Sequence, residues 1–181
     1  MSRAMSRVTG AEDLASMVSS VTRTMCGTTF EPADPSTRGE SLCGQMVLLP
    51  LGGVRQVSIL LACDVTGGRT LAAAMFGMPP GEITQDLADD AVRELLNMVA
   101  GQVSRALSLD SALGLPRATT LAELAQQGGI GIEEGVLLRS TGNVDLRLWI
   151  FERASQATPE PEVAGKGGVF RSLLRAVMPR S

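Results

Sequence analysis

A long amphipathic pattern between Thr84 and Leu107 constrains the fold of this chain more than any other feature. Its large apolar residues recur every three or four positions, as they do on one face of an α-helix. They are Val92, Leu95, Leu96, Val99 and Val103. A helix with one apolar face must bury that face against another layer of structure. The sequence therefore predicts a long helix backed by a packed core, with its opposite face in solvent.

The solvent face of this predicted helix carries a carboxylate and a primary amide three residues apart, Glu94 and Asn97. Positions i and i+3 are neighbours on a helix surface, so both side chains project from one patch. Asp90 and Gly101 fall on the same stripe. A glycine inside a helix costs roughly 1 kcal/mol relative to alanine, and on an exposed face it suits close approach by another molecule. The stripe is predicted to be a docking surface.

The remaining patterns predict an α+β fold with two long helices packed on a mostly antiparallel sheet, because hairpin signals lie at both ends of the domain. The other predicted helices are Glu12–Met25, ended by Gly27, and Thr66–Phe76. The predicted strands are Gln45–Leu51, Arg55–Asp64, Leu113–Ala118, Gly135–Ser140 and Asn143–Arg153.

Three segments of the sequence resemble the chemotaxis phosphatases CheX, CheC and FliY, and CheX most closely, over about Thr9–Ala154. They are Phe76-Gly77-Met78, the run Asp90–Gly101, and Leu113-Gly114-Leu115-Pro116. The family pattern is an acidic or Ser residue, then Glu-x-x-Asn, then a Pro some twenty residues later. Asp90, Glu94, Asn97 and Pro116 match it in order. Pro116 follows Asn97 sooner than in the usual spacing, which indicates a shorter loop.

The resemblance implies a CheC-like fold with a pseudo-two-fold internal repeat, a homodimer paired through the sheet, and hydrolysis of the aspartyl-phosphate on a CheY-like receiver domain. It implies that Asn97 orients the attacking water and that Glu94 pairs with the receiver's Lys. Asp90, Met98 and Gly101 are then partner-binding residues. No cofactor is expected on this chain, because the receiver carries its own Mg²⁺. Asn offers both a donor and an acceptor for water, and phosphoryl transfer depends mainly on orientation and charge stabilisation.

A faint internal repeat is visible when Asp13–Val18 is laid over Glu94–Val99. Chance likeness between two amphipathic helices explains it about as well as duplication does. In this alignment Asp13 and Ser16 replace Glu and Asn. Because Ser is too short to reach as the Asn amide does, we expect a single active site.

Composition excludes several other functions. The chain has no His, so Ser-His-Asp and Cys-His catalysis and His-ligated metal sites are impossible. Its formal net charge of −3 and its scarcity of aromatic residues remove the case for nucleic-acid binding. Cys26, Cys43 and Cys63 are widely spaced and form no Cys-x-x-Cys pair, which favours reduced thiols and no metal site.

The chain is expected to divide into a phosphatase domain (1–154), a flexible linker rich in Pro and Gly (155–168) and a basic amphipathic segment (169–181). The last segment either packs on its own domain, or docks on a partner or an anionic membrane surface. No apolar stretch follows the basic residues Met1–Arg7, so no secretory signal is expected and the protein is expected to be cytoplasmic.

Two alternatives to the phosphatase remain open. The first is a catalytically silent module that docks receiver domains. The second is a scaffold similar to the flagellar switch proteins, which the presence of Glu94 and Asn97 disfavours, because the purely structural switch proteins lack that pair.

Overall fold

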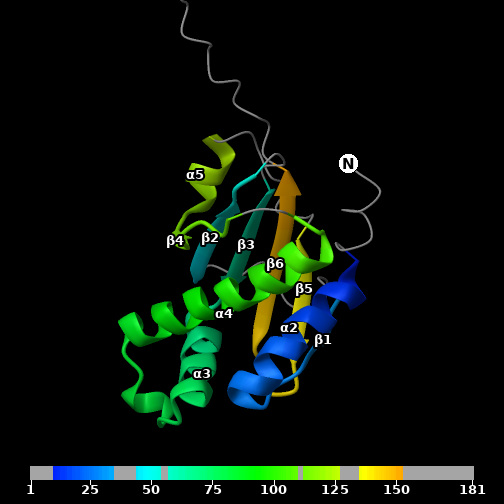
Figure 1. Ribbon diagram of the computed structural model, residues 1–181. Helices are drawn as coiled ribbons and strands as arrows, with labels where there is room; N and C mark the ends of the chain where they lie inside the picture. Colours follow the sequence, from blue (N-terminus) through cyan, green and yellow to red (C-terminus); the bar gives the residue numbers. More distant parts are fainter. Residues whose placement is uncertain (1–9, 35–43, 54–56, 110–111, 127–134, 153–181) are drawn as a thin grey trace, which may run out of the picture.

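Three helices cover one face of an antiparallel sheet in the computed structural model of the chain (Figure 1), which describes residues 10–34, 44–53, 57–109, 112–126 and 135–152. The strands are β1 (Phe30–Pro32), β2 (Gln45–Leu51), β3 (Val57–Cys63), β4 (Arg117–Ala118), β5 (Val136–Ser140) and β6 (Asp145–Glu152). The helices are α2 (Ala11–Cys26), α3 (Val65–Phe76), α4 (Gln85–Ala106) and α5 (Leu121–Gln126), with a 3₁₀ turn η2 (Pro80–Glu82) before α4.

The order of the strands reveals an internal pseudo-symmetry. The sheet runs β1-β5-β6-β3-β2-β4, and every pairing is antiparallel. If β1 is exchanged with β4, β2 with β5 and β3 with β6, the result is the same strand order read from the opposite edge of the sheet. The same exchange relates α2 to α4, because each of these helices precedes the edge strand of its half. The pseudo-two-fold relation expected from the resemblance is therefore present in the topology.

Local sequence signals set the limits of α4. The Thr84 side chain caps the N-terminus by accepting a hydrogen bond from the amide of Leu87 at 3.3 Å. Asp86 lies in the first turn and Arg105 in the last, where each charge complements the helix dipole. Such caps hold the helix in a single register, so the residues of its solvent face keep fixed positions.

The main core lies between the sheet and the helices. Alternate residues of β2 and β3, among them Val47, Leu49 and Ile59, are buried there with the apolar face of α4. The other face of the sheet has a smaller cluster that contains Leu48, Leu60 and Trp149, and Leu124 of α5 packs against it. Helix α4 is thus fixed to the sheet along its length, while α5 belongs to the opposite face.

The structure confirms the α+β class, the three predicted helices and both predicted hairpins to within a few residues at each end. The strand predicted over Leu113–Ala118 is wrong in its extent: Leu113 makes an isolated bridge to Leu51, and only Arg117–Ala118 forms a strand. Strand β1 and helix α5 were not predicted. The linker (155–168) and the basic segment (169–181) lie outside the described residues.

No helix in the described part of the chain combines the length and the apolar character needed to cross a membrane.

Candidate functional site

The stripe predicted from the sequence lies on the solvent side of α4. Glu94 is exposed and Asn97 is half-buried, so the expectation that both stand fully in solvent holds only for the carboxylate. Directly beneath them, Leu95, Leu96 and Val99 are almost completely buried. The two polar groups therefore project from a helix whose other face is locked into the core, which limits their movement.

The amide of Asn97 and the carboxylate of Glu94 contact each other. Asn97 Nδ2 donates a long hydrogen bond of 3.5 Å to Glu94 Oε2. A bond of this length is weak, so it orients the amide without holding it against a better partner. The Oδ1 atom of Asn97 is the atom that would accept a hydrogen bond from water.

Asp90 lies one turn earlier on the stripe and forms an exposed ion pair with Arg93. Such i,i+3 pairs contribute only a few tenths of a kcal/mol. The ion pair can therefore break at little cost in free energy, and each side chain can then bind a group of a partner molecule.

Gly101 provides open space on the stripe. A Cβ atom built at this position meets no atom within 4 Å, and the backbone is in an ordinary helical conformation. The fold thus has no steric need for glycine here. Met98, the other predicted partner-binding residue, is 37% exposed although Met is a good core residue. Both observations suit a surface that another molecule covers.

Helix α2 has the related face in the first half of the chain. Leu14, Ala15 and Val18 are buried like their counterparts Leu95, Leu96 and Val99. Asp13 and Ser16, at the positions of Glu94 and Asn97, are exposed. The structure therefore supports the internal repeat suggested by the sequence over the alternative of chance likeness.

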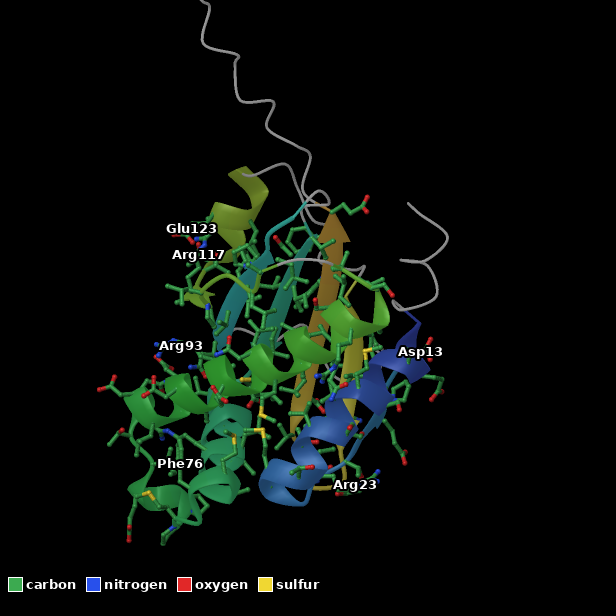
Figure 2. All side chains as sticks on the ribbon, in the orientation of Figure 1. Asp13, Arg23, Phe76, Arg93, Arg117 and Glu123 are labelled. Carbon is green, nitrogen blue, oxygen red and sulfur yellow. The ribbon has the colours of Figure 1, made fainter. Side chains whose placement is uncertain are left out.

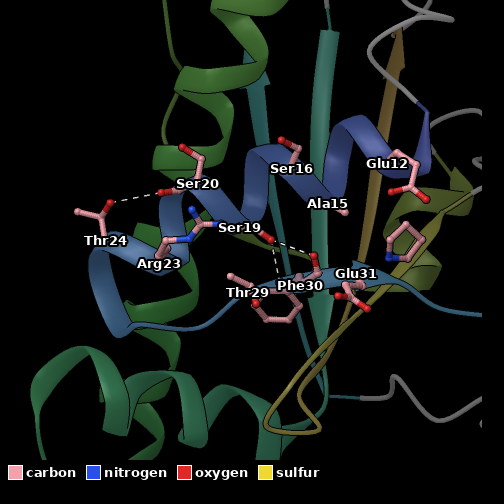
Figure 3. A pocket seen from close by; sticks show the side chains of 11 residues that line it. Glu12, Ala15, Ser16, Ser19, Ser20, Arg23, Thr24, Thr29, Phe30 and Glu31 are labelled. Atoms are coloured by element: carbon pink, nitrogen blue, oxygen red, sulfur yellow. Dashed lines mark hydrogen bonds between the residues drawn. The ribbon is translucent and has the colours of Figure 1, made fainter.

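A hollow of about 630 Å³ lies between α2 and β1 in this half (Figure 3). Its helix side is polar, with small hydroxyl side chains and one guanidinium, and its strand side is β1. The helix residues include Ser16, Ser20 and Arg23, and the strand residues are Phe30, Glu31 and Pro32. Ser19, deeper in the same hollow, exchanges hydrogen bonds of 2.8 and 2.9 Å with the backbone of Phe30 and so ties the helix to the strand.

Pro116, the last element of the sequence pattern, lies directly before β4 on the outer edge of β2. Its neighbour Leu115 is 85% exposed, the highest value among the exposed large hydrophobic residues of the described chain. Sequence reasoning did not select Leu115. The sequence did contain a signal, which was an apolar residue immediately before a proline in a short connection. Folding alone gives no reason for an apolar residue at such a position.

The described residues contain no group of three or more His, Cys, Asp or Glu side chains placed to hold a metal ion. The acidic and amide groups of the stripe are the carboxylates of Asp90 and Glu94 and the amide of Asn97. This set can position water and bind a cation on another molecule.

The comparison with protein families matches residues 46–129 to the model described as chemotaxis phosphatase CheX. This range contains all of β2 except its first residue, together with β3, α3 and the whole of α4. Over these residues the chain is similar to the CheX/CheC-like chemotaxis phosphatases. No curated protein matches the chain at a significant level.

Solved structures share the fold of this CheX-like chain at low sequence identity. CheX from Vibrio vulnificus is 19% identical with a TM-score of 0.54, covering 76% of this chain and 93% of that chain. A chain of the CheX-CheY-BeF3-Mg+2 complex from Borrelia burgdorferi is 14% identical with a TM-score of 0.55, covering 78% and 96%. FliY from Thermotoga maritima is 12% identical with a TM-score of 0.53, covering 84% and 91%. The family resemblance seen in the sequence is thus confirmed by the family model, and the α+β architecture by these structures.

Proposed function

We propose that this chain hydrolyses the aspartyl-phosphate of a CheY-like receiver domain. The observation that carries the proposal is the joint projection of Glu94 and Asn97 from one stripe of a core-anchored helix, within the residues that match the CheX family model. A structural relative with this fold was solved in complex with CheY, BeF3 and Mg+2, which supports a CheY-like protein as the partner.

In the proposed reaction, Asn97 enters the receiver's active site and holds a water molecule in line with the phosphorus. The water oxygen forms the new bond to phosphorus, and the bond from phosphorus to the aspartyl oxygen breaks. Inorganic phosphate leaves, and the receiver recovers its free carboxylate. The receiver's Mg²⁺ neutralises charge on the phosphoryl group. The contribution of this chain is orientation, which together with charge stabilisation accounts for most of the catalysis in such transfers.

Glu94 has a separate role in the proposal. In the free protein its carboxylate accepts the weak hydrogen bond from Asn97. On docking, the receiver's Lys replaces the amide as its partner, because a charged pair is the stronger interaction. This exchange releases the Asn97 amide for the water. Asp90, Met98 and Gly101 contact the receiver around this pair.

The direct test is the decay of a CheY-like receiver domain phosphorylated with a small-molecule donor, measured with and without the full chain. We expect decay to accelerate in proportion to the amount of chain added. A chain that binds the phosphorylated receiver but leaves its decay unchanged is the silent docking module. A chain that binds neither form is a scaffold of the flagellar-switch type.

A further inference from the structure

The segment between α4 and α5 pairs with β2 through a β-bulge. Leu113 stands opposite Leu51, and Arg117 stands opposite Leu48. Between these pairs the edge segment has one residue more than β2 has, so Leu115 and Pro116 together oppose Leu49. A bulge of this kind redirects side chains out of the regular ladder. Proline suits the position because it has no amide hydrogen to leave unpaired.

Gly114 holds the bulge close to β2. Its amide donates to the carbonyl oxygen of Pro50 at 2.8 Å, and a Cβ atom built on it would lie 2.7 Å from Pro50 atoms. Only glycine permits this approach. The edge is therefore built to hold a defined shape at Leu115, whose side chain is 85% exposed while Leu49 opposite it is completely buried. Folding gains almost nothing from an exposed Leu.

One ridge of α4 faces the strand to which the bulge is paired. Asp89 of α4 accepts a hydrogen bond from Gln45 at the start of β2, so this ridge of the helix faces the β2 edge. Positions i+4 and i+8 from Asp89 continue the same ridge, and they are Arg93 and Asn97. Figure 2 shows Arg93 of α4 and Arg117 of β4 on the same side of the view.

The end of the helix also returns to this edge. Ser104 Oγ donates to the carbonyl oxygen of Leu109, and Gly52, just past the end of β2, donates to that of Ala112. After α4, the chain is therefore back at the edge of β2 by Ala112, directly before the bulge.

The pseudo-symmetry gives an independent view of the same arrangement. In the first half, the hollow between α2 and β1 is lined by Ser16, the counterpart of Asn97, and by Pro32 of the edge strand (Figure 3). Exchanging the halves places β4, which Leu115 and Pro116 directly precede, where β1 lies. The Asn97 position and β4 thus correspond by pseudo-symmetry to two walls of that hollow.

We propose that Leu115 is an apolar contact residue for the receiver domain and helps to determine which receiver this chain accepts. The inference rests on the proposed function. A specific protein interface buries about 800 Å² on each partner, from roughly 20–30 residues, so the stripe on α4 cannot supply it alone. The bulge lies on the edge of β2, the strand that α4 packs against, and it exposes a large apolar side chain there. Leu115 touches no reacting atom in this proposal, so it acts on docking and not on the chemical step.

The test compares Leu115→Ser with Leu121→Ser in the full chain. Leu121 is also a partly exposed leucine, on α5 at the opposite face of the sheet. Initial rates of phospho-receiver hydrolysis give KM and kcat separately. Leu115→Ser should raise KM about tenfold or more, because the complex no longer buries a Leu side chain. Its kcat should stay within about twofold of the wild-type value. Leu121→Ser should match the wild type, and Leu115→Met should restore most of the wild-type KM.

The outcomes separate this inference from the proposed function. If the wild-type chain does not accelerate decay, the proposed function fails, and the role assigned to Leu115 fails with it. If the wild type is active and Leu115→Ser keeps the wild-type KM, the inference is overturned while the function stands. Sedimentation of the wild type and of Leu115→Ser tests whether a second copy of the chain binds this surface instead. Loss of a dimer in Leu115→Ser, with an unchanged KM, would assign this surface to a second copy of the chain instead.

Discussion

At the residue scale, Gly101 is the position where stability and docking make opposite demands. Gly101→Ala should raise the free energy of unfolding by up to about 1 kcal/mol, because alanine is the better helix former and the added Cβ meets no atom. The same methyl group would stand on the docking surface and raise KM for the phospho-receiver. Denaturant unfolding and steady-state rates measure the two effects.

The control for Gly101 is Gly81→Ala in the η2 turn, where an added Cβ also meets open space. It should leave KM unchanged, since it lies off the stripe. A Gly101→Ala variant with a wild-type KM would show that the receiver does not approach the helix backbone at this point.

Glu94 provides a second prediction at the same scale. If its carboxylate pairs with a receiver Lys, Glu94→Ala should raise KM for the phospho-receiver, because docking loses that charge pair. The effect on KM should weaken as salt concentration rises. Stability should change by no more than about 0.5 kcal/mol, since the side chain is exposed. Glu82→Ala, which removes an exposed carboxylate from η2, is the matched control; an equal rise of KM in both variants would argue against a specific pair.

At the element scale, strand β3 contains a thiol that makes stability depend on pH. Burial, together with Asp64 and Asp89, raises the pKa of Cys63 from 9.0 to about 12. Between these values the thiol ionises in the unfolded chain but not in the folded one. Its contribution to stability is therefore complete below about pH 9 and is lost as the pH rises toward about 12.

The loss should be visible because few other groups titrate in this range. The chain has no Tyr, and Lys166 is its only lysine. Unfolding measured from pH 8 to pH 11 should show stability falling with pH, and Cys63→Ala should reduce the slope at the cost of a less stable protein at pH 8. An unchanged slope in that variant would assign the effect to other groups.

Elements with strong local periodicity could be predicted from the sequence, and those defined by tertiary pairing could not. Helix α4 follows from the spacing of its apolar residues and the Thr84 cap, and the same spacing places Glu94 and Asn97 on the opposite face. Strand β1 has three residues and ends in Pro32, so no alternation is visible. The bulge at Leu115 depends on its register with Leu49, which belongs to a segment far away in the sequence.

At the scale of the whole molecule, the homodimer expected from the resemblance stays a prediction. The two edges of the sheet are β1 and β4, with three and two residues. Pro32 lies in β1 and Pro116 directly precedes β4, and neither proline can donate a hydrogen bond to an added strand. We therefore expect a weak dimer whose sedimentation mass rises with concentration. A monomer mass that stays constant across concentrations would exclude it.

The whole fold, in this account, holds one amide at the surface so that a partner's phosphoryl group and a water molecule meet it. Core burial of α4 fixes the helix, Glu94 orients the amide, and Gly101 leaves room for the partner. Such a role separates chemistry from binding, because an interaction made only in the transition state affects kcat and not docking.

The most direct test is therefore the rate of phospho-receiver decay with Asn97→Ala, measured at several concentrations of the variant beside the wild type. We predict a loss of kcat of about a hundredfold or more, of the size seen when a positioned catalytic group is removed, with KM within about twofold and stability nearly unchanged. Wild-type decay rates with Asn97→Ala would contradict the phosphatase mechanism and leave the docking module as the function of this surface.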